Sequence, residues 1–354
     1  MNAVATELWN KLERAGLVSG DRPATPPGES PWYVRLLLAI SGWLASLFFL
    51  GFFGAAISSL FRNETVALTV GALLIGGACV LLKAGKNEFI EHAALAFSFT
   101  GQFLVIYAIF HWTGGYLGWL IAALFELGLA LLITNAIHTT ASALVATVCF
   151  STSLTLLGVP YIADSIAIFA AAWLWLHEFD YPQRMRKMKA LGYGFILGTI
   201  QFKGTNIYAF FLIGWNSRGF KGEHWVQPWM GDLLLGAITL YVIWQILKRL
   251  GYRLKQPLTL AALGSGALLT LASVAAHGIT IGLLILLLGF SAGNRVLMGL
   301  GVTALLYYLS AYYYLLQTTL LVKAGTLLVI GLVLLGARWL LLRLAPSARR
   351  VRHG

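Results

Sequence analysis

Charged residues are scarce in this chain of 354 residues. Asp, Glu, Lys and Arg make up 11% of it, hydrophobic residues make up 59%, and the mean hydropathy is +0.79. Soluble proteins average about 25% charged residues, so this composition excludes a water-soluble enzyme and predicts a chain embedded in lipid. The apolar stretches are continuous and lack the short alternating segments of barrel strands. The sequence therefore predicts an all-α, polytopic transmembrane helix bundle.

Residues that build disulfides, metal sites and cofactor sites are also few. The two cysteines, Cys79 and Cys149, lie in apolar runs, where cysteine usually acts as a small hydrophobe. The seven histidines are dispersed, and no two lie four residues apart, as metal ligands on one helix face do. The sequence also lacks a phosphate loop, a dinucleotide fingerprint and a nucleophile elbow. We therefore predict no metal, no cofactor and no enzymatic activity. An intramembrane enzyme acting on lipid would need convergent polar groups that the sequence does not reveal.

The first thirty residues differ from the rest of the chain. Val4, Leu8 and Leu12 share one helical face, which predicts a short amphipathic helix over residues 3–15 that ends at Gly16. Four prolines between residues 21 and 31 predict a stiff linker. We expect a cytoplasmic helix and linker in residues 1–30, a transmembrane domain in residues 31–345 and a basic cytoplasmic tail in residues 346–354.

Twelve apolar stretches are candidate transmembrane helices. They occupy residues 34–60, 65–82, 93–110, 115–134, 139–157, 161–176, 190–214, 231–247, 258–276, 278–293, 296–316 and 319–344. The ninth and tenth depend on a break at His277-Gly278, because the apolar run of residues 258–293 is too long for one helix.

The basic residues predict the orientation of these spans. With the N-terminus inside, 19 of the 25 Lys and Arg residues fall in cytoplasmic segments. The other six are Arg62, Arg218, Lys221 and Lys323 in outer segments and Lys203 and Arg338 within spans. Because short cytoplasmic loops carry an excess of Lys and Arg, both termini are predicted to be cytoplasmic. This bias also explains the net charge of +12 without a nucleic-acid partner.

The start of the chain resembles a known family. Residues 8–18 read LWNKLERAGLV, and after the proline-rich joint follow PWYVR from Pro31 and GWLASLFFLG in residues 42–51. These segments resemble the start of a bacterial family of integral-membrane domains of unknown function. Members of that family occur beside another polytopic family and beside small membrane proteins named for a GDYXXLXY motif. The resemblance implies a bacterial inner-membrane protein with membrane partners, and it implies no activity and no catalytic residues.

Glu126 is the first candidate for a functional residue. Ionisable groups at membrane depth are costly and often functional, and Glu126 lies eleven residues, or about 17 Å, into its predicted span. Ala122, Ala123 and Ala130 lie one turn away, so another helix can approach closely. Glu126 is either a proton- or cation-coupling carboxylate or a neutral, hydrogen-bonded acid that fixes helix packing.

Lys203 is the second candidate, and it forms a polar stripe with Thr199 and Asn206. The stripe could line a substrate path, with Lys203 as an anion site or as the ion-pair partner of Glu126. Alternatively, the helix could end near Ile200, which would place Lys203 at the outer interface.

Three further polar positions have simpler explanations. Interhelical hydrogen bonds would account for Gln102, which has Ser98 one turn earlier. Asp164 falls at the start of a span, where a carboxylate caps free N–H groups. Residues 177–180 (HEFD) could be proposed as a metal site, but a solvated span end explains them better.

Two functions are compatible with this topology. The first is a permease-like protein that moves a small solute, an ion or a lipid; residues 184–189 divide the spans six and six, as in transporters built from two halves, although no repeat is visible. The second is a non-catalytic subunit or scaffold of an envelope complex. Such a subunit would dock other polytopic proteins through residues 3–18 and through its Gly-rich helices.

Under the second hypothesis, deletion of residues 1–20 abolishes co-purification of a membrane partner, because the docking helix is removed. Native mass spectrometry of the gently solubilised protein measures this. Unaltered recovery of the partner would remove the docking hypothesis.

Overall fold

The computed structural model describes residues 63–84, 88–160, 162–212, 228–272, 278–315 and 319–344, together with residues 11, 13–16, 37, 41, 44, 48 and 51. Within the long ranges the chain forms eleven α-helices and one 3₁₀ turn. They are α3 (Glu64–Ala84), α4 (Glu88–Thr113), α5 (Gly115–Leu132), α6 (Ala136–Leu156), α7 (Ala163–Leu176), η2 (Pro182–Arg184), α8 (Met185–Leu212), α9 (Pro228–Arg249), α10 (Pro257–Ala272), α11 (Ile279–Ser291), α12 (Arg295–Leu315) and α13 (Leu320–Leu344).

Each predicted span from residue 65 onward overlaps one of these helices. Of the helices in the described ranges, seven are long and apolar enough to cross a membrane, whereas α7, α10 and α11 are apolar but have only 14, 16 and 13 residues. The first predicted span, residues 34–60, lies outside the described ranges apart from single positions. For the described residues, the prediction of an all-α fold with several helices able to span a membrane is confirmed.

Glycine ends or begins a helix at two predicted places. Gly278 has a φ of +95° and directly precedes α11, so the predicted break in the apolar run of residues 258–293 is present. Gly16 has a φ of +68° and follows helical residues at Lys11, Glu13 and Arg14, as a helix stop requires. Residues 3–10 and 12 of the predicted amphipathic helix lie outside the described residues.

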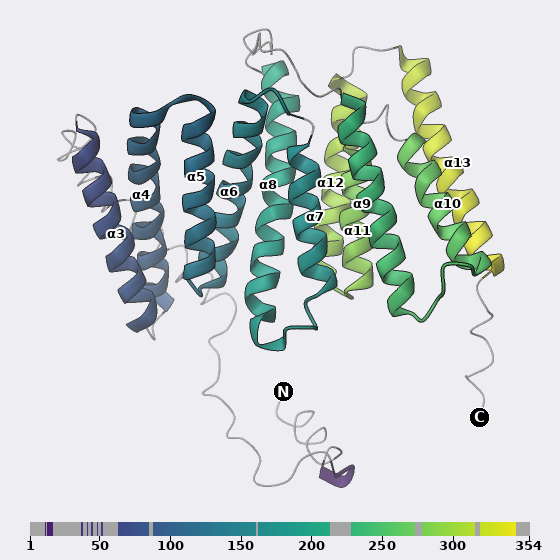
Figure 1. Cartoon of the computed structure of the whole chain (residues 1–354), viewed down its shortest axis with the longest axis horizontal. Helices are drawn as coiled ribbons and strands as arrows, with labels where there is room; N and C mark the ends of the chain where they lie inside the picture. Colours follow the sequence, from purple (N-terminus) through teal and green to yellow (C-terminus); the bar gives the residue numbers. More distant parts are fainter. Residues whose placement is uncertain are drawn as a thin grey trace.

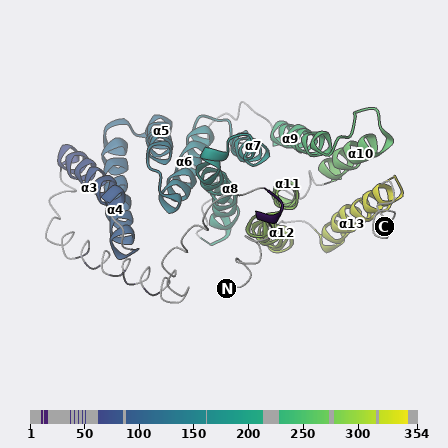
Figure 2. The ribbon, with the colours of Figure 1, turned by 90° about the horizontal axis from the view of Figure 1, so that it is seen from below.

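The helices stand side by side in an elongated band, with consecutive helices running in opposite directions (Figure 1). Helices α3, α4 and α5 occupy one end, and α10 and α13 occupy the other (Figure 2). The largest apolar core lies between them and is built from α7, α8, α9, α11 and α12, with the fully buried side chains Ile196, Ile285 and Tyr308 at its centre.

Glycines set the closest helix contacts. Gly194 and Gly198 of α8 lie one turn apart against the backbone of α6, where an added Cβ would come within 2.6 Å of the Thr140 oxygen and 2.9 Å of the Leu144 oxygen, respectively. The spacing of this glycine pair therefore lets the backbones of α6 and α8 cross closely. Gly289 likewise packs against the α12 backbone, but Gly293 has nothing within 4 Å and instead forms the turn after α11 with a φ of +62°.

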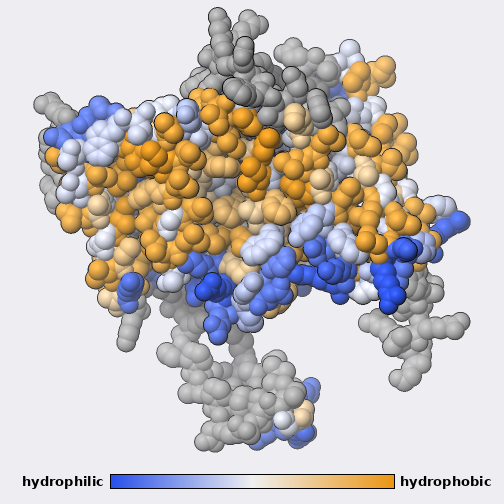
Figure 3. Space-filling view, in the orientation of Figure 1, coloured by the Kyte–Doolittle hydropathy of each residue, from blue (hydrophilic) through white to orange (hydrophobic). Residues whose placement is uncertain are grey.

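Basic residues gather along one edge of the band, which we call the basic edge. It comprises the end of α3, the start of α8, the α9–α10 turn, the start of α12 and the end of α13, and it shows as blue along the lower border of Figure 3. The residues are Lys83, Arg184, Arg186, Lys187, Lys189, Lys248, Arg249, Arg253, Lys255, Arg295 and Arg343. They lie on one side, as the predicted topology requires, and the assignment of that side to the cytoplasm stays a prediction.

We expect Gly194→Ala to lower the unfolding free energy by about 1–3 kcal/mol, because the new methyl group would lie 2.4 Å from the Cβ of Ala143. The melting temperature of the purified protein in detergent measures this loss. Gly128→Ala on α5 is the matched control, since nothing lies within 4 Å of its Cβ position. Equal melting temperatures for the two variants would contradict the close α6–α8 contact.

Candidate functional site

Five polar side chains meet between α4, α5 and α6, and we call them the α4–α6 cluster. Ser98 and Gln102 come from α4, Glu126 from α5, and His138 and Ser142 from α6; each is at most 4% exposed. Polar groups at this depth need partners from the protein, because lipid offers none.

Local sequence explains why these residues share one interface. Ser98 and Gln102 lie four residues apart on α4, and His138 and Ser142 lie four residues apart on α6, so each pair occupies one helix face. Asn135 starts α6 by accepting hydrogen bonds from the backbone N–H groups of residues 137 and 138. This cap places His138 in the first turn of the helix, at the basic edge.

Hydrogen bonds join four members of the cluster around the His138 ring. Its Nε2 lies 2.8 Å from Ser98 Oγ and 2.9 Å from Gln102 Nε2. The same amide nitrogen donates to Ser142 Oγ at 3.3 Å, and His138 Nδ1 lies 3.5 Å from that oxygen. Phe99 stacks on the ring with a centroid distance of 5.6 Å. Ser98, Gln102, His138 and Ser142 thus satisfy one another.

Glu126 differs from the other four members. Its carboxyl group is fully buried and faces the Ser142 hydroxyl, but neither oxygen completes a hydrogen bond within the described part of the chain. Leaving a buried polar group without a partner costs about 1–3 kcal/mol, and more if the group is charged. Ala122, Ala123 and Ala130, all buried on the same helix, allow the close approach that encloses it.

Lys203 forms an ion pair with Asp164 and not with Glu126. Its Nζ lies 2.9 Å from Asp164 Oδ2, and the two side chains are 27% and 7% exposed. Helix α8 continues to Leu212, so the expectation of a helix end near Ile200 is wrong. Asp164 is the second residue of α7, which begins at the edge opposite the basic one. The Asp164–Lys203 pair and the α4–α6 cluster therefore lie toward opposite edges of the band.

The remaining candidates lie apart from the α4–α6 cluster. Thr199 is buried, and its hydroxyl donates to the Phe195 carbonyl of its own helix at 2.8 Å. Asn206 lies in α8, with its side chain outside the described part of the structure. Of the predicted polar residues, the structure brings Gln102 and Glu126 together on adjoining helices.

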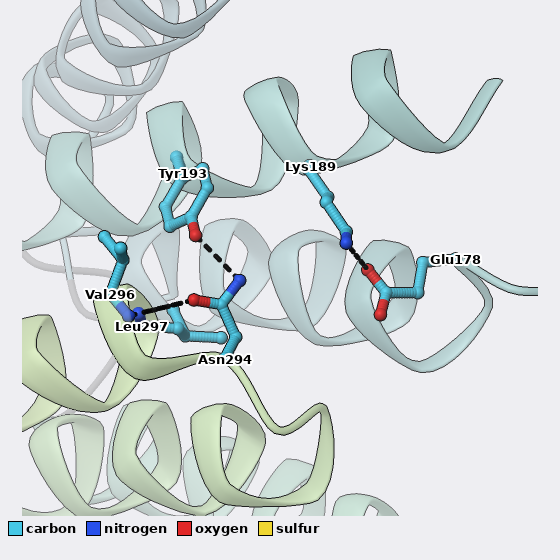
Figure 4. Close-up of polar contacts among 6 residues, drawn as sticks. All are labelled: Glu178, Lys189, Tyr193, Asn294, Val296 and Leu297. Carbon is cyan, nitrogen blue, oxygen red and sulfur yellow. Dashed lines mark hydrogen bonds and ion pairs between the residues drawn. The ribbon is translucent and has the colours of Figure 1, made fainter. Parts of the chain in front are cut away.

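The turn after α7 is more buried than expected. Glu178 is 1% exposed and lies 3.5 Å from Lys189 Nζ on α8, so the prediction of a solvated span end is wrong for this residue (Figure 4). Beside this pair, Asn294 caps α12 and donates to Tyr193 Oη of α8 at 2.8 Å (Figure 4). Within the described ranges, no group of three His, Cys, Asp or Glu could hold a metal.

His138 is the functional candidate that the sequence did not single out. A search for paired histidines passes over a lone one, and hydropathy does not show which helices adjoin. A helix-capping Asn135, followed by histidine and then by serine one turn later, was the available signal. The cluster can hold a proton or a small cation, since it combines one carboxyl group, one imidazole and three neutral polar groups.

We expect Lys203→Met to destabilise the protein by about 3 kcal/mol, because it leaves the buried Asp164 carboxylate unpaired. Asp164→Asn alone should lower the unfolding free energy by less than Lys203→Met does. The double variant should lower it by less than the sum of the two single-variant losses. Thermal unfolding of the four proteins in detergent gives the coupling energy, which should reach at least about 1 kcal/mol. Strictly additive effects would show that the pair contributes no net interaction.

Comparison with known proteins identifies the family to which the chain is similar. No curated protein and no solved structure matches the chain. One family, described as a domain of unknown function (DUF4401), matches residues 31–344, a range that contains every helix from α3 to α13. This match covers most of the sequence, and the chain belongs to the DUF4401 family.

Proposed function

We propose that the protein is a permease-like membrane protein that moves a small solute, ion or lipid and binds the transported or coupled ion at the α4–α6 cluster. The observation that carries this proposal is the Glu126 carboxyl group, fully buried between helices with no completed hydrogen bond among the described residues. Ionisable groups inside a membrane domain commonly mark ion pathways.

A purely structural role explains Glu126 less well. Buried polar groups that only fix packing are normally hydrogen-bonded, as Ser98, Gln102, His138 and Ser142 are here. Glu126 lies beside that network and leaves two oxygens without a partner from the described chain. A bound proton or cation would satisfy those oxygens, which favours an ion-binding role.

The charge of the cluster limits the ion that it can take. Glu126 is its single carboxyl group, and the Asp164 carboxylate is paired with Lys203. Divalent cations such as Ca²⁺ usually require several oxygen ligands and more than one negative charge. A proton or a monovalent cation fits the cluster better.

We also propose that the protein resides in a bacterial cytoplasmic membrane with both termini in the cytoplasm. The gathering of basic residues on one edge of the band supports this orientation. The resemblance of its first sixty residues to a bacterial membrane family supports the location and the association with other polytopic proteins.

Ion flux into proteoliposomes tests the transport role. We expect the reconstituted protein to carry H⁺, Na⁺ or K⁺ faster than protein-free liposomes under an imposed membrane potential. Glu126→Gln should lower this flux at least about tenfold, because the only carboxyl group of the cluster is replaced by a neutral amide.

Glu178→Gln is the matched control, since it makes the same change at a buried glutamate outside the cluster. It should retain the wild-type flux. The transport proposal fails if the wild-type protein carries none of the three ions, or if both variants behave alike.

A further inference from the structure

We propose that five basic residues at one end of the basic edge form a binding site for an anionic phospholipid. They are Lys248, Arg249, Arg253, Lys255 and Arg343, and we call them the basic corner. The first four lie in the last turn of α9 and in the α9–α10 turn, and Arg343 lies in the last turn of α13. The site does not depend on the proposed transport role.

Helix packing brings these residues together. Helix α10 packs against α13, and the two run in opposite directions, so the start of α10 and the end of α13 meet at the basic edge (Figures 1 and 2). Gly251 makes the α9–α10 turn compact, since its φ is +83° and its N–H donates to the Lys248 carbonyl at 3.0 Å. Four positive charges therefore fall within residues 248–255, around one tight turn.

The basic corner has no acidic side chain in its own part of the sequence. No Asp or Glu follows Asp232, which lies near the start of α9, at the opposite edge of the band. All five basic residues are exposed, and none forms an ion pair with another described residue. Elsewhere on the basic edge, Lys189 is paired with Glu178, and Lys187 donates to the Leu131 carbonyl. The corner thus keeps its positive charge for a group from outside the described chain.

Aromatic and apolar side chains lie directly beside these charges. Arg343 stacks over the exposed ring of Trp339, with its guanidinium carbon 4.0 Å from the ring centroid. Leu250, Leu254 and Leu342, each next in sequence to a basic residue, are more than half exposed. Tryptophan favours the headgroup level of a bilayer and leucine favours its acyl chains, so the surface matches both parts of a phospholipid.

This combination favours an anionic phospholipid over other anions. A soluble phosphate would be held by charge alone and would leave the exposed leucines without an apolar partner. A phospholipid places its phosphate among guanidinium and ammonium groups and its acyl chains against the leucines. A zwitterionic headgroup adds a cation that the corner repels, so a lipid with net negative charge fits best. Helix α10 begins at this corner, and the positive end of its dipole adds to the attraction.

Native mass spectrometry of the full chain in detergent micelles tests the site. The protein is titrated with phosphatidylglycerol or with phosphatidylcholine of the same acyl chains. Wild type should bind phosphatidylglycerol at least about tenfold more tightly. The triple variant Arg253→Gln, Lys255→Gln, Arg343→Gln should lower that affinity at least about tenfold, because three of the five charges are removed. Its affinity for phosphatidylcholine should not change.

The triple variant Lys83→Gln, Arg184→Gln, Arg186→Gln is the matched control, since it removes three exposed charges from other parts of the basic edge. It should bind phosphatidylglycerol within about twofold of wild type, because distant exposed charges are screened. Equal losses in the two triple variants would overturn the proposal, since the lipid would then respond to the charge of the whole edge. Displacement of the lipid by inorganic phosphate, but not by chloride at the same ionic strength, would also overturn it.

Tryptophan fluorescence provides a second readout, which needs no change of charge. Brominated acyl chains quench nearby tryptophans, and Trp339 marks the basic corner. In phosphatidylcholine bilayers, brominated phosphatidylglycerol should quench wild type more than the same fraction of brominated phosphatidylcholine does. The difference should shrink in Trp339→Phe, which removes the reporter and keeps an aromatic ring beside Arg343. Equal quenching of wild type by the two brominated lipids would overturn the site.

Discussion

Lipid offers no hydrogen-bond partners, so every polar group within the bundle depends on the protein itself. The structure meets this constraint by local means at most positions. Asn135 and Asn294 cap helices, the Thr199 hydroxyl donates to its own helix, and the buried Lys323 ammonium donates to the Tyr313 carbonyl at 2.7 Å. Several other buried side chains of the described residues also keep one polar atom without a partner, and Glu126 differs from them because both of its carboxyl oxygens lack one.

The positions of the helices could be predicted because apolar length and basic turns are local properties of a sequence. The run of residues 258–293 illustrates this: its length required a break, and Gly278 provides one. Glu126 and Gln102 could also be selected as candidates, since each is a polar residue in an apolar run. Their meeting between α4, α5 and α6 could not be predicted, because periodicity identifies the face of a helix but not the helix that packs against it.

The same limit explains the errors at Lys203 and Glu178. Both residues find an opposite charge on another helix, Asp164 for Lys203 and Lys189 for Glu178. Each pair joins α8 to the region of α7, so the two helices are linked by charge near both of their ends. Glycine adds the closest contact on the other side of α8, where Gly194 and Gly198 approach α6. Helix α8 is thereby fixed between the two ends of the band by two ion pairs and one close backbone contact.

The elongated shape of the band has a consequence for how a solute could cross it (Figure 2). In a barrel-like ring of helices, a path can run along a central axis. The band of described helices has no such axis, and within a bilayer its two broad faces would be turned toward acyl chains or toward other helices. Any hydrophilic route through a single copy must therefore run along a seam between neighbouring helices, and opening it means that one block of helices slides or tilts against the next.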